Sequence, residues 1–300
     1  MPAIGRLRAC ARPPGIPTRR RGEDQRVRTI EQRAAEFDRV HAARELGDWR
    51  YYTSGGGESG EAVLLLPGGA GIGISWVDLA LALHPAYRTT TVDYPPSATT
   101  PGELVDGVLD VLDAEGIDRV HVVGQSAGGM VAEVLAQRAP DRVASLVFTG
   151  TGLYGPEDVD RLAGKVAAIR NTPWEHTLDT ARAALRTAWR QSPEADFWIA
   201  RVDTAYRRAG RDGLANSYAV LLDIARHSGE LRPARHCPTL VLAADDDPLI
   251  TPTQRQRLLD LHPDHELRVF PDGGHSLLLT RTADYVAEVT RHLREAAPPA

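Results

Sequence analysis

Residues 122–130 read VVGQSAGGM, and this stretch decides the expected fold. It completes the apolar run RVHVVG and leads into MVAEVLAQRAP, which has the composition of a helix. A solvated turn would account for the Gly, Ser and Gln, but it would need neither the apolar approach nor the helix that follows. The order is therefore strand, very tight turn and helix, with Ser126 at the turn.

A turn this sharp needs small residues around its apex. A side chain at Gly124 or Gly128 would collide with the neighbouring strand or helix, and together with Ser126 these residues meet the G-x-S-x-G pattern. The turn projects the serine hydroxyl outward and places free N–H groups of the helix beside it. A serine that merely caps a helix is the competing interpretation, but the position between an apolar strand and a helix favours a nucleophile.

Strands and helices alternate around this turn. We expect a helix from Thr29 to about Leu46 and a strand within DWRYYTSGGGESG, which opens into a glycine-rich turn. The strands that follow are predicted at 62–69, 87–95, 119–124 and 143–150, and the helices between and after them near 75–84, 102–115 and 127–138. Such alternation implies parallel βαβ crossovers, and the all-apolar VLLL and VHVV fit central strands covered on both faces.

The alternation stops after Gly152. Residues 156–226 are helical in character, and strand signals return only in TLVLAADDD (239–247) and ELRVFPDGG (266–274), with helices near 252–261 and 282–295. The predicted fold is α/β, with a mostly parallel central sheet flanked by helices and a helical insertion lying over it. The expected division is a basic extension at 1–28, a core at 29–152 and 228–300, and a helical cap at 153–227.

Composition restricts the class of protein. A chain of 300 residues with 42% hydrophobic content can bury a sizeable core, and no apolar run approaches the roughly 18 residues of a membrane-spanning helix. Only Cys10 and Cys237 are present, which excludes a disulfide framework and a multi-cysteine metal site. We therefore expect a soluble protein of a reducing compartment, the cytoplasm, without a membrane partner.

Charge is distributed unevenly along the chain. Residues 1–28 hold 8 Arg and 2 acidic residues, and removing these from the totals of 35 and 40 leaves 27 basic and 38 acidic residues elsewhere. The remainder is thus acidic and does not suggest a nucleic-acid surface. The first 28 residues lack the apolar centre of a secretory signal, and their Arg, Pro and Gly predict disorder.

A serine hydroxyl is a poor nucleophile until a base accepts its proton, and the base needs a partner to orient it. His275 is the best candidate among 10 histidines, because it follows a predicted strand in an exposed glycine-rich loop. His121 lies inside an apolar strand and is expected to be a core group. Asp247 follows the preceding strand, so both loops leave carboxyl ends of strands, where ligands bind in open α/β sheets.

Two loops leave alternatives open. The run Asp245, Asp246 and Asp247 could be a solvated turn, a hard-cation site or the source of the orienting acid. The loop LLLPGGAGIG could bring a backbone N–H, that of Gly69, to a developing oxyanion, together with the N–H of Ala127. It lacks the Lys-Ser/Thr ending of a P-loop, which argues against a nucleotide site.

With these residues in hand, the chain resembles the α/β-hydrolase superfamily over about 250 residues, from Trp49 to the last helix. The elbow GQSAGG, the acid loop AADDDPLITP, the sequence GGHS and the helical region before the acid loop occur in the family's order. The resemblance implies no cofactor, and it implies a nucleophile, an acid, a base and two oxyanion donors: Ser126, Asp247, His275, Gly69 and Ala127. The N-terminal half looks maspardin-like. Pro67 and VDYPPSATT depart from the family pattern and leave the substrate class open.

The expected activity is that of a serine hydrolase acting on an ester, thioester or lactone of a small, mostly apolar molecule. Aromatic residues of the cap could line its pocket, or they could simply pack the cap onto the core. Candidate substrate-binding residues are Gly68, Gln125, Trp174 and Trp198. The alternatives are a lyase or cyclase that uses the same cavity without covalent catalysis, and a non-catalytic binding member of the fold.

Overall fold

The structure is a computed structural model that describes residues 28–190, 192–233 and 237–296. The predicted basic extension, apart from Arg28, lies outside the described residues. Eight strands form one sheet in the order β1-β2-β4-β3-β5-β6-β7-β8. They are β1 (Ala42–Leu46), β2 (Trp49–Thr53), β3 (Ala62–Leu66), β4 (Arg88–Asp93), β5 (Val120–Gln125), β6 (Val143–Thr149), β7 (Thr239–Ala244) and β8 (Glu266–Phe270).

The sheet is mostly parallel, which confirms the predicted fold class. Strands β3 to β8 pair in parallel, whereas β1 pairs antiparallel with β2, and β2 pairs antiparallel with β4. Parallel pairing requires crossovers, and helices supply them: α2 (Val77–Leu83), α3 (Pro101–Ala114), α4 (Ala127–Arg138) and α8 (Pro252–Leu261). The strand order reverses between β3 and β5, where open α/β sheets bind their ligands.

Strand β3 explains why the sheet is covered on both faces. All five of its residues are buried, and alternate side chains point to opposite faces. Leu64 and Leu66 belong to a core cluster with residues of α3, α4 and α8. Val63 and Leu65 belong to a second cluster with α1 (Ile30–Val40), α2 and α10 (Thr282–Ala296). The apolar run VLLL is thus the middle layer of three.

The N-terminal part differs from the sequence-based expectation. A helix was predicted to continue to about Leu46, but α1 ends at Val40 and residues 42–46 form β1. Gly47, with φ +56°, and Asp48 link β1 to β2 in a tight hairpin. All five residues of β1 are exposed at the edge of the sheet, so they carry no apolar alternation that could have indicated a strand.

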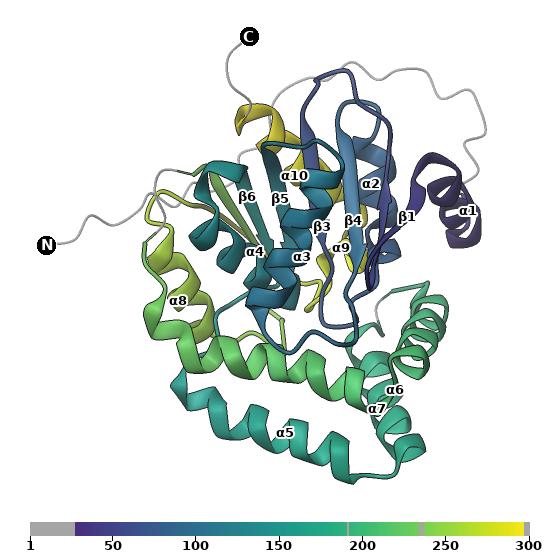
Figure 1. Cartoon of the computed structure of the whole chain (residues 1–300), viewed down its shortest axis with the longest axis vertical. Helices are drawn as coiled ribbons and strands as arrows, with labels where there is room; N and C mark the ends of the chain where they lie inside the picture. Colours follow the sequence, from purple (N-terminus) through teal and green to yellow (C-terminus); the bar gives the residue numbers. More distant parts are fainter. Residues whose placement is uncertain (1–27, 191, 234–236, 297–300) are drawn as a thin grey trace, which may run out of the picture.

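The helical region lies between β6 and β7. It contains α5 (Val159–Asn171), α6 (Trp174–Ala188) and α7 (Ala195–His227), which lie together beyond one end of the sheet (Figure 1). Helix α7 is interrupted at Gly210, where φ is +70° and ψ is −175°. Among the described residues, no helix is both long enough and apolar enough to cross a membrane.

Candidate active site

Ser126 sits at the turn between β5 and α4. Its φ of 52° and ψ of −120° make it the only described residue other than glycine with a positive φ. A side-chain carbon at Gly124 would lie 2.6 Å from the carbonyl oxygen of Gly128, and one at Gly128 would overlap the carbonyl oxygen of Leu66. The glycines are therefore required sterically, as predicted, and the turn holds Ser126 in a strained backbone conformation.

His275 and Asp247 form a hydrogen-bonded chain with Ser126. His275 Nε2 lies 2.9 Å from Ser126 Oγ, and His275 Nδ1 lies 3.2 and 3.1 Å from the two carboxylate oxygens of Asp247. The side chains of His275 and Asp247 are only 9% and 6% exposed. The fold thus brings together the three residues singled out in the sequence as nucleophile, base and acid.

The protonation state of Asp247 fixes the tautomer of His275. Burial raises the pKa of Asp247, but hydrogen bonds from His275 and from the backbone N–H groups of Leu249 and Ile250 outweigh it and leave the pKa below its ordinary value. The carboxylate is therefore ionised at neutral pH and can only accept. Nδ1 of His275 must then carry the proton, which leaves Nε2 free to accept the hydroxyl proton of Ser126.

The three consecutive aspartates have different surroundings. Asp247 contacts His275, whereas Asp246 Oδ1 accepts the backbone N–H of Gly274 at 2.7 Å, which ties the acid loop to the histidine loop. Asp245 and Asp246 are exposed. Among the described residues, no group of three or more His, Cys, Asp or Glu is arranged to hold a metal ion.

Gly150 is part of the site and was not singled out in the sequence. It follows β6 with φ +51°, and a side-chain carbon there would lie 2.5 Å from the carbonyl oxygen of His275. The same carbon would lie 3.5 Å from His275 Nδ1 and 3.6 Å from Asp247 Oδ2. The absence of a side chain at Gly150 therefore allows the histidine loop to reach Ser126.

Gly69 and Ala127 line the same cavity as Ser126. Ala127 is the first residue of α4, so its N–H has no partner within the helix. Neither its N–H nor that of Gly69 has a hydrogen-bond partner among the residues that the structure describes. Two free donors beside the serine are what an oxyanion site needs, and their role as such stays a prediction.

The cavity above Ser126 has a volume of about 550 Å³ and lies between the sheet and the helical region. Its apolar walls include Trp189, Trp198, Leu278 and Leu279, and its polar end holds Tyr154, Asp158, Arg161 and Gln254. Asp158 accepts hydrogen bonds from Arg161 at 2.7 Å and from Gln254 at 3.1 Å. The polar groups at this end are therefore largely paired with one another, and the apolar walls remain for a ligand.

The four candidate substrate-binding residues separate into two groups. Gly68, Gln125 and Trp198 line the cavity, and the indole N–H of Trp198 is buried without a hydrogen-bond partner in the described part of the chain. Trp174 is absent from these walls. It begins α6 and packs against Val166, Ile169, Leu214 and Ala215, so it contributes to packing within the helical region, and its contact with a substrate stays a prediction.

Comparison with known families decides the classification. The family described as alpha/beta hydrolase fold matches residues 61–282, which include Ser126, Asp247 and His275. The chain belongs to the α/β-hydrolase family. This confirms the resemblance drawn from the elbow, the acid loop and the histidine loop.

The relatives of this α/β hydrolase are enzymes. The protein described as "Putative carbamate hydrolase RutD" from Variovorax paradoxus is 30% identical over 83% of this chain and 97% of its own length. A 2-hydroxy-6-oxononadienedioate/2-hydroxy-6-oxononatrienedioate hydrolase from Cupriavidus pinatubonensis is 26% identical over 76% of this chain and 85% of its own. The crystal structure of a hydrolase from Pseudomonas aeruginosa superposes with a TM-score of 0.71 at 23% identity, covering 84% and 98% of the two chains. These relatives set aside a non-catalytic binding module.

Proposed function

We propose that this hydrolase cleaves an ester, thioester or lactone of a small, mostly apolar molecule by covalent catalysis at Ser126. The observation that carries the proposal is the chain of hydrogen bonds from Asp247 through His275 to Ser126 Oγ at the floor of a largely apolar cavity. A buried base with one nitrogen oriented by a carboxylate and the other against a serine is suited to nucleophilic attack.

The reaction follows from the positions of the protons. Ser126 Oγ attacks the carbonyl carbon while its proton passes to Nε2 of His275, and Asp247 stabilises the imidazolium that forms. The N–H groups of Gly69 and Ala127 bind the negative charge on the carbonyl oxygen. His275 then gives its proton to the leaving alcohol or thiol. Water, deprotonated by His275, attacks the acyl group and releases the acid and Ser126.

The walls of the cavity support the substrate class. Trp189, Trp198, Leu278 and Leu279 offer apolar surface, and Trp189 is held by a 3.0 Å hydrogen bond from its indole N–H to Ser276 Oγ. The names of two relatives mention a carbamate and 2-hydroxy-6-oxononadienedioate as substrates, so both compounds belong in a wider substrate screen.

A panel of p-nitrophenyl esters, an acyl thioester and a lactone, assayed with the wild-type and Ser126→Ala proteins, tests the proposal. We expect turnover of at least one class and loss of about 10⁴-fold or more in Ser126→Ala. If Ser126→Ala keeps more than about a tenth of the activity, the reaction does not pass through an acyl-serine, and the lyase or cyclase interpretation is favoured.

A further inference from the structure

A second cavity of about 260 Å³ lies beside the catalytic one. Both cavities are lined by the loop from Gly69 to Ile72, by Ala127 and by Tyr206. Ser126 and His275 line only the catalytic cavity. The proposed oxyanion donors thus form the boundary between the two spaces.

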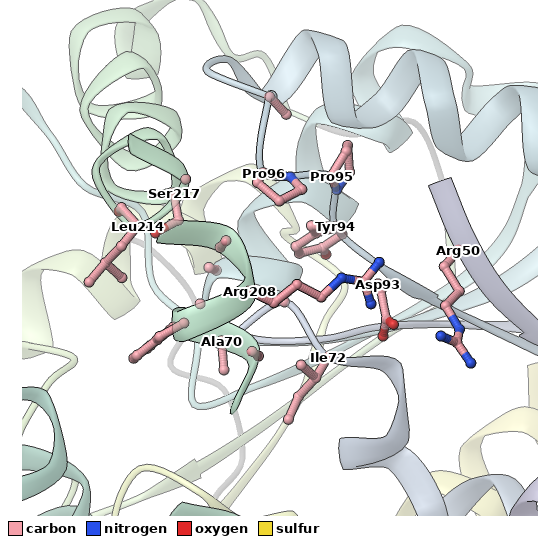
Figure 2. Close-up of a pocket in the computed structure, with 18 of the residues that line it drawn as sticks. Arg50, Ala70, Ile72, Asp93, Tyr94, Pro95, Pro96, Arg208, Leu214 and Ser217 are labelled. Atoms are coloured by element: carbon pink, nitrogen blue, oxygen red, sulfur yellow. Dashed lines mark hydrogen bonds between the residues drawn. The ribbon is translucent and has the colours of Figure 1, made fainter. Parts of the chain in front are cut away.

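The walls of the second cavity are apolar close to this boundary. Ile72, Tyr94 and Pro96 come from the loops after β3 and β4, and Leu214 comes from α7 (Figure 2). Val131, one turn after Ala127 on α4, closes the inner side. A hydrocarbon chain can be buried against these side chains.

The outer end of the cavity is charged. Asp48 and Asp93 face it together with three arginines: Arg50, Arg201 and Arg208. The guanidinium of Arg208, from α7, and that of Arg50, from β2, are drawn on either side of Asp93 in Figure 2, and both attract its negative charge. The lining therefore carries one more positive than negative charge.

The carboxylate of Asp93 has other hydrogen-bond partners and is not hydrogen-bonded to these arginines. Its carboxylate accepts the N–H of Gly73 at 2.7 Å and the hydroxyl of Tyr52 at 3.1 Å. Among the described residues, neither Arg50 nor Arg208 has a nitrogen within 4.0 Å of a carboxylate oxygen. Two guanidinium groups at the end of an apolar chamber thus keep their donors free for a ligand.

We propose that the second cavity receives the acyl chain of the substrate and that this chain ends in a carboxylate bound by Arg208 and Arg50. The inference rests on the proposed function and adds the substrate class to it. The leaving group must face His275, which protonates it, and His275 lines only the first cavity. The acyl chain then extends past Gly69 and Ala127, toward the arginines.

The test uses pairs of p-nitrophenyl esters that differ only in terminal charge. The charged substrates are mono-p-nitrophenyl esters of unbranched dicarboxylic acids from glutarate to suberate, so each acyl chain ends in a free carboxylate. Each is matched by the ester of the same chain length in which a primary amide replaces that carboxylate. Rates are measured after subtracting the uncatalysed reaction, for the wild type, Arg208→Gln and Arg50→Gln. Arg211→Gln is the matched control, because Arg211 is an exposed arginine of α7 that is absent from the cavity walls.

We expect the wild type to favour the charged ester at one chain length by about tenfold in kcat/KM, as a charge-assisted hydrogen bond provides. Arg208→Gln should lose about tenfold on that ester, mainly through KM, while the amide ester and the Arg211→Gln control change by less than about twofold. Equal kcat/KM values for both esters in the wild type and in Arg208→Gln would overturn the inference and leave the hydrolase proposal standing.

Two further outcomes separate the remaining possibilities. Free adipate should compete with the charged ester. If it instead accelerates hydrolysis of the neutral ester, the anion is a separate ligand and the inference is wrong.

If a fluorophosphonate labels Ser126 but neither ester is hydrolysed, calorimetry tests the inference by comparing the binding of monomethyl and dimethyl adipate to Ser126→Ala. Tighter binding of the monoanion, lost in Arg208→Gln, supports the inference, and equal binding overturns it. Failure of both labelling and turnover contradicts the proposed function itself.

Discussion

His275 Nε2 lies 2.9 Å from Ser126 Oγ, although 149 positions separate the two residues in the chain. Each residue is at the carboxyl end of its own part of the parallel sheet, Ser126 directly after β5 and His275 shortly after β8. The contact is therefore a consequence of sheet topology: parallel strands bring their following loops to one edge. Gly150, between the two loops, leaves the room that the contact needs.

The acid can be assigned by comparing the three aspartates. Asp247→Asn should cost about 10⁴-fold in turnover, because an amide N–H facing Nδ1 of His275 favours the wrong tautomer. Asp245→Asn should change turnover little, since Asp245 is exposed. Asp246→Asn should have an intermediate effect, because Asp246 binds the N–H of Gly274 beside His275. Steady-state kinetics of the three variants checks this order, and normal turnover in Asp247→Asn would contradict the assignment.

The backbone strain at Ser126 should have a measurable effect on the free energy of unfolding. Glycine adopts a φ of 52° with a ψ of −120° at less cost than a residue with a side chain. Ser126→Gly should therefore be more stable than Ser126→Ala by about 1 kcal/mol, with both variants inactive. Urea denaturation of the two variants gives the comparison. Equal urea midpoints would show that the backbone conformation at position 126 costs alanine no more than glycine, which would contradict the inferred strain.

The elbow glycines should differ sharply from Gly69 in their tolerance of a side chain. Gly128→Ala places a methyl group against the carbonyl oxygen of Leu66, and we expect destabilisation of about 3 kcal/mol by overpacking. Gly69→Ala is the control, since no atom lies within 4 Å of the added carbon, and its stability should change by less than about 1 kcal/mol. A stable Gly128→Ala protein would mean that α4 can move away from β3.

His41 should make the free energy of unfolding decrease as pH falls from about 6.5 toward 4. Burial, with a further contribution from His84, lowers the pKa of His41 to about 4 from 6.5. The unfolded chain therefore binds a proton that the folded chain resists, so His41's contribution to stability is complete above pH 6.5 and is lost as pH falls toward 4. His41→Gln should reduce this slope relative to the wild type in urea titrations over that range. An unchanged slope would show that His41 is not the group responsible.

The sequence was sufficient to predict those features that depend on local patterns. Ser126, Asp247 and His275 could be found because each stands beside an apolar strand with glycine or proline next to it, and the resemblance supplied their roles. Strand β1 could not be found, because its five exposed residues have no apolar alternation and, in the described part of the chain, it pairs with β2 alone. Arg50 and Arg208 lack any shared motif, and only the fold places β2 and α7 at one cavity. The packing of Trp174 within the helical region could not be predicted, because the sequence of a cap does not show whether an aromatic residue faces the cavity or the neighbouring helices.

The most direct measurement of the central claim is covalent labelling with a fluorophosphonate, followed by mass spectrometry of the digested protein. The account predicts one adduct per chain, on the peptide that contains Ser126, since this serine both contacts the imidazole of His275 and lines the cavity. Ser145, whose hydroxyl contacts His121, is fully buried and out of reach of the reagent. Labelling should disappear in Ser126→Ala and fall strongly in His275→Gln, in which the base is lost. An unlabelled wild-type protein, or an adduct on another serine at equal rate, would contradict nucleophilic catalysis at Ser126.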